Sequence, residues 1–334
     1  MRRLTLILSD LYLPEEAGPD ATVPEALALP QLEWLLRFAQ SRAIPDWRRA
    51  LSLDVGRADL AVQSSAVLAA RDCLHVTPAE FVWLATPVRL EARLDHVRML
   101  DRGMPRLAPD EREQLRVQFA RAFAPAYALH DAGPRGFLLT GLAKAEVTTV
   151  DPARLLDADI GRAQPSGAAA RELRRLAAEI EMWMHGLPGK PAARPSALWL
   201  WGGGPHTPAP ARTSPLPTAM STLRYHGDDP GFAGLARATT GAVPAAVPAD
   251  FAAAQGAPDR VIVEMTPMNG GADESLSALD ARWFAPARAA LSAGELDSLD
   301  VVANDRWFRI AARPSWRFWR RRVSWLGQLR AAAR

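Results

Sequence analysis

The sequence predicts an α/β protein built on a mostly parallel sheet with helices on both faces. Short apolar runs typical of buried strands recur along the chain, and segments with helical spacing of apolar residues separate them. A composition of 49% hydrophobic and 23% charged residues is that of a globular protein. We expect the 334 residues to form a single α/β domain, residues 1–334.

The first half of the chain alternates strands and helices. Leu4–Leu8 is a short apolar run closed by Ser9 and Asp10, which predicts a buried first strand. A proline-rich loop follows. The elements expected after it are a helix at 32–39, a helix at 57–72, a strand at 81–85, a helix at 109–123 that starts with proline and two carboxylates, a strand at 136–140 and a helix at 168–185.

The second half repeats this alternation and ends differently. A strand at 196–201 runs into three glycines, and a proline-rich exposed loop at about 205–217 follows. Short helices at 230–240 and 247–255, a strand at 260–265 and a helix at 274–293 come next. The last two strands, at 299–303 and 307–311, flank the turn Asn304-Asp305, which predicts an antiparallel hairpin at the sheet edge near the C-terminus.

The basic residues are unevenly distributed. The net charge of +3 combines residues 1–305, at −6, with the Arg/Trp-rich C-terminal segment 306–334, which has nine arginines and no acidic residue. Four tryptophans lie between Trp307 and Trp325. Such a segment can bind nucleic acid or an acidic membrane surface, or it can fold back on an acidic body. We expect it to dock on the protein itself, with nucleic acid and membrane as alternatives.

Cysteine usage and hydropathy exclude several classes of protein. Cys73 is the only cysteine, which excludes an internal disulfide and a cysteine-based zinc cluster and predicts a buried structural thiol. No apolar run approaches the 18 residues of a membrane span. The apolar run near the N-terminus is too short for a secretory signal, so a cytoplasmic location is expected.

The strongest local signal is Leu198–Gly204, where three glycines follow a buried strand. Glycines let the backbone turn sharply and bring N–H groups close to an anion, at the edge where α/β proteins bind ligands. The candidates for binding a phosphate or carboxylate group are therefore Trp201, Gly202, Gly203 and Gly204. The residues alone favour the alternative, a tight turn without a ligand, because no helix start or phosphate-binding lysine follows.

Few carboxylates are placed to hold a metal. Asp10 follows the first strand, and Asp228 and Asp229 follow His226, but no two histidines share a metal-ligand spacing. A metal site needs several such groups to converge. These three aspartates are therefore weak candidates, and each suits a turn or a helix cap equally well. We expect no cofactor, with a divalent metal as the alternative.

Four segments together resemble one known family across nearly the whole chain. They are Phe81–Leu90 (FVWLATPVRL), Ala178–Pro188 (AEIEMWMHGLP), Leu198–Gly204 (LWLWGGG) and Trp316–Arg321 (WRFWRR). The family is proteobacterial and is labelled either cofactor-independent phosphoglycerate mutase-like protein or RpfE-type regulatory protein. The resemblance implies an alkaline-phosphatase-like α/β core, a cytoplasmic location and a link to regulation.

The chain departs from the family pattern at an implied site. The family reads Ala-Asp-Pro-Val-His-Leu where this chain has Ala85–Leu90, so Thr86 and Arg89 replace an aspartate and a histidine. The metal-dependent mutases of the superfamily also need a serine nucleophile and a late Asp-His pair, and this chain has no late Asp-His dipeptide. Thr86 and Arg89 join Asp10 and the glycine segment as candidate ligand-binding residues, and no catalytic residue is assigned.

These observations support three hypotheses. The first is a catalytically degenerate phosphoglycerate-mutase-like protein, not an enzyme, that regulates by binding a phosphate- or carboxylate-bearing ligand or a protein partner. The second is a divergent metal-dependent mutase or phosphatase, with Ser9 or Ser64 as nucleophile, Asp10 with Asp228 or Asp229 as metal ligands, and Arg89 holding the substrate phosphate. The third assigns nucleic-acid or membrane binding to the Arg/Trp-rich segment.

Overall fold

The fold is that of a computed structural model, which describes residues 2–13, 27–72, 81–142, 147–187, 194–206, 223–256, 259–270, 275–313 and 324–330. Contacts between Cα atoms divide the chain into two compact units. Unit 1 consists of Met1–Leu51, Leu216–Gly227 and Pro244–Arg334, and unit 2 consists of Ser52–Pro215 and Asp228–Val243. The sequence was expected to form one α/β domain, and it contains no linker that signals this division.

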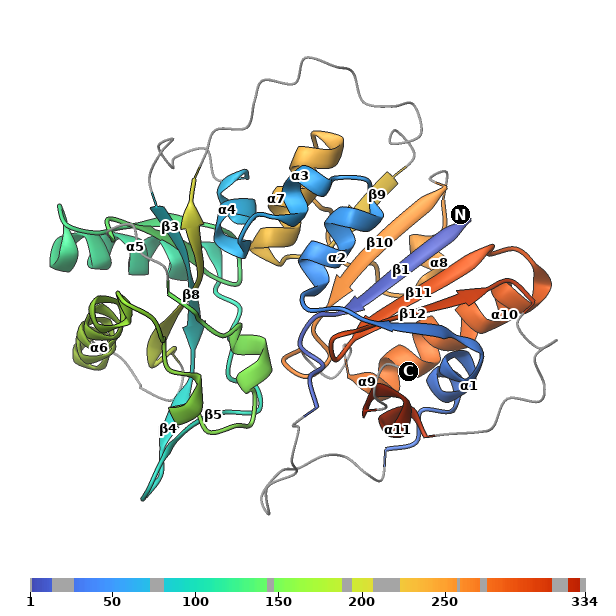
Figure 1. Ribbon diagram of the computed structural model, residues 1–334, viewed down its shortest axis with the longest axis horizontal. Helices are drawn as coiled ribbons and strands as arrows, with labels where there is room; N and C mark the ends of the chain where they lie inside the picture. The colour runs from blue at the N-terminus through green and yellow to red at the C-terminus, as the bar shows by residue number, and fades with distance from the viewer. Residues whose placement is uncertain are drawn as a thin grey trace. The chain divides into compact units, whose positions relative to one another are not determined.

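Unit 1 contains a six-stranded sheet in the order β2-β12-β11-β1-β10-β9 (Figure 1). Its strands are β1 (Arg3–Leu8), β2 (Gln40–Ala43), β9 (Leu223–His226), β10 (Arg260–Met265), β11 (Ser298–Ala303) and β12 (Arg306–Ala311). β11, β1, β10 and β9 are parallel, whereas β12 and β2 are antiparallel to their neighbours. The predicted parallel sheet and its C-terminal hairpin are confirmed, although β2 and not β12 is the outermost strand.

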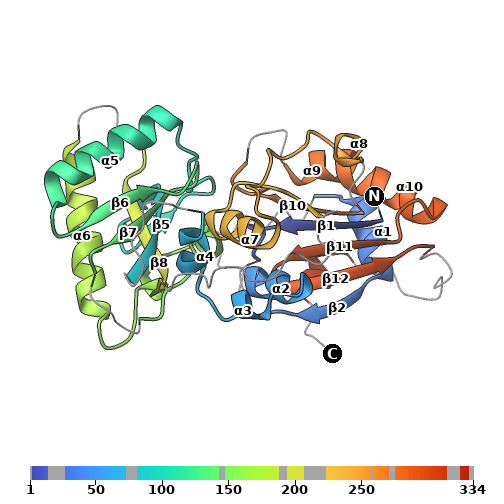
Figure 2. The ribbon, with the colours of Figure 1, turned by 90° about the horizontal axis from the view of Figure 1, so that it is seen from above.

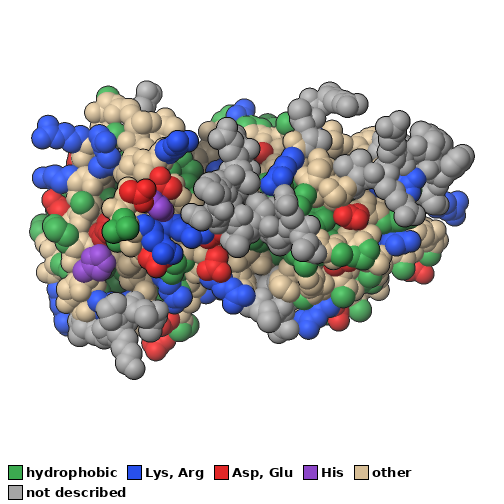
Figure 3. Space-filling view, turned by 90° about the horizontal axis from the view of Figure 1, so that it is seen from below, with side chains coloured by type: hydrophobic (Ala, Val, Ile, Leu, Met, Phe, Trp, Pro, Cys, Tyr) green, Lys and Arg blue, Asp and Glu red, His purple; other side chains and the backbone are tan. Residues whose placement is uncertain are grey.

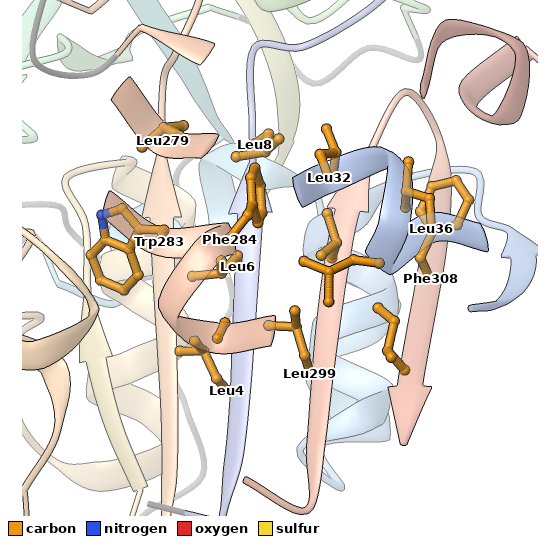
Figure 4. Packing of buried hydrophobic residues seen from close by; sticks show 14 of the residues in the cluster. Leu4, Leu6, Leu8, Leu32, Leu36, Leu279, Trp283, Phe284, Leu299 and Phe308 are labelled. Atoms are coloured by element: carbon orange, nitrogen blue, oxygen red, sulfur yellow. The ribbon is translucent and has the colours of Figure 1, made fainter. Parts of the chain in front are cut away.

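One face of this sheet is apolar and carries the core of unit 1. Leu4, Leu6 and Leu8 alternate along β1, and they are buried together with Leu299 of β11 and Phe308 of β12 (Figure 4). The two-residue period of a strand places these side chains on one face. Burying each large apolar side chain contributes about 1.5–3 kcal/mol, so this face is the main source of stability in unit 1.

Helices cover both faces of the unit 1 sheet. The apolar face is covered by α1 (Pro30–Phe38), α8 (Phe251–Ala254), α9 (Leu276–Leu279), a π-helical turn (Asp280–Phe284), α10 (Ala285–Ala293) and α11 (Trp325–Arg330). α2 (Trp47–Asp54) lies on the opposite face (Figures 1 and 2). The expectation of helices on both faces is therefore confirmed.

The opposite face also carries buried polar side chains in the strands themselves. Asp300 in β11 has no exposed surface. Its carboxylate accepts hydrogen bonds from Nε of Arg3 (2.8 Å), Nε of Arg309 (2.8 Å) and Nε1 of Trp307 (3.0 Å). Arg3 lies in β1 and the other two donors lie in β12, so the sheet register places all three. Because a buried carboxylate without donors costs several kcal/mol, this Asp300 network is required for the face to pack.

The start of α1 is completed by a residue distant in the sequence. Leu29, at the N-cap position, makes no side-chain hydrogen bond there, and Pro30 follows it. Asp280, in the π-helical turn, accepts the N–H groups of Leu32 (2.8 Å) and Gln31 (3.2 Å). Burial raises the pKa of Asp280, although these two hydrogen bonds oppose the shift. Asp280 therefore supplies the helix cap that the local sequence lacks.

Unit 2 contains a four-stranded antiparallel sheet in the order β6-β7-β3-β8. Its strands are β3 (Phe81–Val88), β6 (Ala128–Asp131), β7 (Phe137–Thr140) and β8 (Ala197–Pro205). α5 (Pro109–Phe123) and α6 (Ala170–Gly186) pack on one face (Figure 2). On the other face lies α4 (Ser65–Ala70), which packs against α7 (Pro230–Thr240). β4 (Leu90–Ala92) and β5 (Val97–Met99) form a separate hairpin.

The three strands predicted here at 81–85, 136–140 and 196–201 exist, but they pair with one another and do not join the parallel sheet. A short apolar run identifies a buried strand without showing the direction of its neighbours. Among the described residues, the elements that were not predicted are β2, α2, β4, β5, β6, β9, α11 and the 3-10 helices Pro152–Leu155 and Gly161–Ala163. They are short, and β2 is exposed along its whole length, so it has no apolar periodicity.

Two predicted helices are interrupted. The helix expected at 57–72 is two short helices, α3 (Ala58–Ala61) and α4. The break occurs because the Ser64 side chain accepts the Val67 N–H and caps α4. The helix expected at 274–293 contains the π-helical turn that presents Asp280.

The described parts of the Arg/Trp-rich segment belong to unit 1. Trp307 of β12 and Trp325 of α11 are buried. Nε1 of Trp325 donates to the Leu27 carbonyl (2.9 Å), and its backbone N–H donates to Glu33 of α1 (3.2 Å). These parts of the segment are therefore elements of the fold.

Some expectations lie outside the described residues. They concern Cys73, residues 207–217 of the proline-rich loop, and the Trp316–Arg321 segment that carries part of the family resemblance.

The described helices fall short of what a bilayer requires. None of them is both long enough and apolar enough to cross a membrane.

Candidate functional site

The carboxyl ends of β1 and β10 form the first candidate region, at the edge of the sheet where α/β proteins usually bind ligands. Asp10 follows β1 and is buried. Its Oδ2 accepts the backbone N–H groups of Met268 (3.1 Å) and Asn269 (2.7 Å) from the loop after β10. The Gly270 N–H closes that loop on the Thr266 carbonyl (2.7 Å). Asp10 therefore ties the loop after β10 to the end of β1.

Ser9 and Glu264 form a buried polar pair beside Asp10. Glu264 has no exposed surface, and Ser9 is 4% exposed. The Ser9 hydroxyl donates to Oε1 of Glu264, and its Oγ also lies 3.1 Å from the Met265 carbonyl. A hydroxyl has one proton, so it can donate to only one of these two acceptors at a time. A carboxylate in this position can act as a base toward the hydroxyl, so the pair combines a nucleophile with a base.

His226 ends β9 in the same sheet and is buried. Its Nδ1 lies 2.8 Å from the Ala246 carbonyl. Because a carbonyl only accepts, Nδ1 carries the hydrogen, and in the neutral ring the lone pair lies on Nε2. Burial lowers the pKa of His226, and this effect outweighs the hydrogen bond to Ala246, which raises it. His226 is therefore held as a neutral imidazole.

Two of the predicted ligand-binding residues meet in unit 2. Nε1 of Trp201 in β8 donates to Oγ1 of Thr86 in β3 at 2.8 Å. The antiparallel pairing of the strands, with Leu84 opposite Trp201, places the two side chains close together. Trp201 is buried and Thr86 is partly exposed. The sheet therefore joins these two residues, a relation that the sequence did not indicate.

Gly202 lies inside β8 and not in a turn after it. The register of β8 against β3 shifts at this point, which gives a bulge, and Gly202 has a φ of +62°. A bulge with positive φ favours glycine. The Gly202 N–H donates to Oγ1 of Thr149 (3.0 Å). The expected turn after the strand is therefore wrong, because the strand continues through the glycines to Pro205.

Gly203 and Gly204 are required by close packing. A Cβ atom on Gly203 would lie 2.5 Å from the Trp83 ring, and one on Gly204 would lie 2.5 Å from Oγ of Ser64. Both distances are too short for real contacts, so β8 needs glycine to approach β3 and α4. Packing accounts for these glycines, and their binding of a ligand stays a prediction.

Arg89 follows β3 and anchors a neighbouring loop through its backbone. Its N–H donates to the Gly103 carbonyl (2.7 Å), and its carbonyl accepts the Leu100 N–H (3.2 Å). Its side chain is partly exposed. Arg89 therefore helps to position the loop that carries Arg106.

Arg106, Arg135 and Asp228 form an ionic cluster in unit 2, which we call the arginine fork. Nε of Arg106 lies 2.7 Å from Oδ2 of Asp228, and Nε of Arg135 lies 2.6 Å from Oδ1. Burial alone would raise the pKa of Asp228, but Arg135 and Arg106 together hold it below its usual value. Asp228 is therefore ionised and binds both guanidinium groups.

Asp229 has a local structural role. Its Oδ1 accepts the Phe232 N–H (2.8 Å), and Pro230 occupies the first turn of α7. This is the arrangement of an N-cap aspartate followed by proline. This agrees with the alternative that the sequence favoured equally for Asp229, a helix cap.

The described residues do not fit a divalent-metal site. Among them, no group of three or more His, Cys, Asp or Glu side chains is arranged to hold an ion. The three weak candidates each have other contacts: Asp10 binds backbone amides, Asp228 binds two arginines, and Asp229 caps α7. Asp10 belongs to unit 1, whereas Thr86, Arg89, the glycines and Asp228 belong to unit 2.

Sequence reasoning missed three residues of these sites. Glu264 lies in the strand Arg260–Met265, and a charged residue within such an apolar run was the available signal. Arg106 and Arg135 gave no signal. The sequence has 38 arginines, and nothing distinguishes these two from the others before the fold brings them together.

Comparisons with known proteins give limited information. No protein-family model and no curated protein matches the chain. Solved structures similar to it include the following two. One is the cofactor-independent phosphoglycerate mutase from Thermoplasma acidophilum, at 15% identity and a TM-score of 0.39, over 93% of this chain and 89% of that one. The other is the PH0037 protein from Pyrococcus horikoshii, at 12% identity and a TM-score of 0.44, over 93% and 87%. Such low values carry no argument about this protein's chemistry.

Proposed function

We propose that this protein is a catalytically degenerate phosphoglycerate-mutase-like protein that acts by binding, with a phosphate- or carboxylate-bearing ligand or a protein as partner and a regulatory role in the cytoplasm. The observation that carries the proposal is the set of contacts that the Asp10 carboxylate makes. Its carboxylate stands at the end of the first strand, and it accepts two backbone N–H groups of the loop after β10. A carboxylate used in this way stabilises the loop.

The family resemblance supports the same proposal. Thr86 and Arg89 stand where the family pattern has an aspartate and a histidine. Thr86 accepts the Trp201 indole N–H, which is a structural contact between β3 and β8. An arginine provides a cation where the family has a proton-transfer or metal-binding group, so the change favours anion binding over metal binding.

Metal content and turnover test this proposal directly. We expect purified protein to bind no stoichiometric manganese and to show neither phosphoglycerate mutase nor phosphatase activity when manganese is added. Metal would be measured by mass spectrometry and activity by product formation. Robust turnover that Asp10→Ala abolishes would overturn the proposal.

A matched control separates loss of a ligand from loss of stability. Asp250 accepts the Ala253 N–H (2.8 Å) and caps α8, so Asp250→Ala also removes a carboxylate that binds backbone. If both variants lose similar stability and neither changes metal content, Asp10 has a structural role. Loss of metal or activity in Asp10→Ala alone would assign it to a metal site.

The Ser9–Glu264 pair favours a second candidate, a divergent phosphoryl-transfer enzyme with Ser9 as nucleophile. Ser64, the other candidate, caps α4, which leaves Ser9 with the more suitable contacts. In this case Glu264 would accept the Ser9 proton as Oγ attacks phosphorus, while the bond from phosphorus to the ester oxygen breaks and the alcohol leaves with a proton from water. The test is to trap a phosphoserine with a phosphate-monoester substrate and locate it by mass spectrometry. Absence of label on Ser9, with unchanged activity in Ser9→Ala, would exclude this candidate.

A further inference from the structure

We propose that the outer edge of β2 is a docking site for an extended acidic segment of a partner protein, which adds to the unit 1 sheet as a further strand. The inference deepens the proposed function, on which it rests for a role in binding, by naming the kind of protein partner and the residues that receive it. Three properties of β2 support it: an open backbone edge, the fixed position of Arg42, and an excess of positive charge nearby.

β2 is the last strand on its side of the six-stranded sheet, and all four of its residues are exposed. Among the described residues, β12 is the only strand that pairs with it. The Ile44 N–H donates to the Asp305 carbonyl (2.8 Å), which sets the phase of the antiparallel ladder, so Arg42 exchanges its hydrogen bonds with β12. Ser41 and Ala43 therefore direct their backbone N–H and C=O groups away from β12, as a strand that receives a neighbour must.

Arg42 lies between these two residues, on the face of the sheet that carries the Asp300 network. It is opposite Trp307 in the register, and its Cζ lies 5.0 Å from the centre of the Trp307 ring. The Trp307 indole donates in turn to Asp300 (3.0 Å), which the sheet encloses. Because the ring on which it stacks is itself fixed, the Arg42 guanidinium is held beside the open edge before any partner arrives.

The charge of Arg42 is available to a partner. Its side chain is exposed, and among the described residues no carboxylate lies within ion-pair distance of it. Residues 37–49 contain four arginines and one acidic residue, Asp46, and β12 adds two arginines, of which Arg309 binds the enclosed Asp300. On the face drawn in Figure 3, by contrast, acidic and basic side chains are interspersed. The local excess of positive charge therefore favours an acidic partner.

The register of the edge defines the pattern of the partner. Side chains alternate between the two faces of a strand, so residues of an added strand that lie beside Arg42 and Gln40 share one face with them. A negative charge directly across the ladder from Arg42 is favourable. Acidic residues at alternate positions therefore fit this edge, whereas the positions between them lie beside Ser41 and Ala43 and need no charge.

A second copy of the chain fits the edge poorly. If two β2 strands paired with all their outward backbone groups bonded, Ser41 of each would lie opposite Ala43 of the other, and Arg42 would lie opposite its own copy. Like charges directly across a ladder are destabilising. The edge is therefore protected from pairing with itself and open to a strand of opposite charge.

Peptide binding to the full chain tests the proposal. The probe is a fluorescein-labelled peptide of alternating valine and glutamate, and fluorescence anisotropy measures its affinity. We expect saturable binding, at least about threefold tighter than that of an alternating valine–glutamine peptide, as one surface charge pair provides. The same glutamate peptide with methylated backbone nitrogens cannot form a ladder and should bind more weakly by a similar factor. Equal affinity of the glutamate peptide and either of the other two would overturn the proposal.

Two variants and a matched control locate the binding. Arg42→Glu should lose the preference for the glutamate peptide and bind an alternating valine–lysine peptide in its place. Ala43→Pro removes an outward N–H without removing a bond to β12, and it should weaken binding at least about threefold. Arg49→Glu makes the same charge change at an exposed residue of α2, off the strand, and should leave the affinity within about twofold. A loss in Arg49→Glu equal to that in Arg42→Glu would overturn the proposal, because binding would then follow overall charge.

Sedimentation of the protein without peptide tests the other occupant. A dimer that Ala43→Pro dissociates would place a second copy on the edge and overturn the proposal. The comparison of the three peptides on wild type needs no variant, so it decides the question even if a variant does not fold. Because these readouts involve neither metal nor turnover, specific peptide binding by an active enzyme would overturn only the proposed function, and an inactive protein that binds none of the peptides would overturn only the inference.

Discussion

Two carboxylates in this protein each contact two arginines, and their surroundings differ. Asp300 lies within the unit 1 sheet, its side chain has no exposed surface, and its donors Arg3 and Arg309 come from the strands on either side. Asp228 lies in unit 2, its side chain is 24% exposed, and its donors come from loops. The same chemical group is therefore fully enclosed in one place and partly reached by solvent in the other.

The difference shows that two carboxylates with the same number of arginine partners can differ in their access to solvent. A carboxylate enclosed between strands cannot exchange its arginines without opening the sheet, because the backbone ladder fixes their positions. A carboxylate on loops can leave its arginines at much lower cost, because solvent replaces it. Access and backbone context, more than charge, separate the Asp300 network from the arginine fork.

The largest effect is expected for Asp300→Ala. It removes a fully buried acceptor of the buried Trp307 indole and of two arginines whose side chains are partly exposed, so we expect a loss of about 3–5 kcal/mol in the free energy of unfolding. Urea denaturation at neutral pH measures it. A loss below about 1 kcal/mol would mean that the enclosed and the partly exposed carboxylate do not differ as described.

Asp228→Ala should have a smaller effect, about 1–3 kcal/mol, the usual range for hydrogen bonds to a charged group. Because the arginines hold the pKa of Asp228 below its unfolded value, its stabilisation is present above about pH 4 and is lost as the pH falls through the folded pKa. Unfolding of wild type and variant should therefore converge in acid. A difference that stays constant down to pH 2 would contradict this assignment.

Asp280→Asn tests a carboxylate whose pKa is shifted in the opposite direction. Burial raises the pKa of Asp280, so its ionisation destabilises the folded protein. The contribution of Asp280 is therefore greatest below about pH 4 and falls as the pH rises through the folded pKa. Asp280→Ala should cost about 1 kcal/mol through loss of the α1 cap. The difference in unfolding free energy between wild type and Asp280→Asn should therefore fall from pH 3 to 8, whereas the difference between wild type and Asp228→Ala should rise.

The smallest effect is expected for Asp131→Ala. Asp131 is about half exposed, pairs with Arg112 and accepts the Gly133 N–H (2.9 Å), so its removal should cost about 1 kcal/mol or less. The measurement is urea denaturation at low and high salt. A cost equal to that of Asp228→Ala would show that a single exposed arginine pair stabilises as much as the fork.

Much of the unit 1 fold could be predicted from its sequence. β1, β10, β11 and β12 are apolar runs with short turns, so their existence and the C-terminal hairpin followed from periodicity alone. The antiparallel sheet of unit 2 could not be predicted, because strand direction depends on partners that are distant in the sequence. Short elements such as β2 have no buried face and therefore left no pattern.

The candidate sites were harder to predict than the fold. Asp10 was identified because a polar residue ended an apolar strand, but its contacts with Met268 and Asn269 lie more than 250 residues away. The glycines after Trp201 suggested an anion-binding turn, although packing against Trp83 explains Gly203. A sequence shows that glycine is present, and only the structure shows whether conformation or crowding requires it.

The position of β1 has a consequence for how the protein is made. β1 leaves the ribosome about 250 residues before both of its neighbours, because β10 and β11 lie after residue 259. Its apolar side chains must therefore stay unpaired through most of synthesis, while nearly all of unit 2 has already emerged. We expect slowed translation after residue 259 to leave an aggregation-prone nascent chain, whose exposed segment is β1, the strand that later lies inside the sheet.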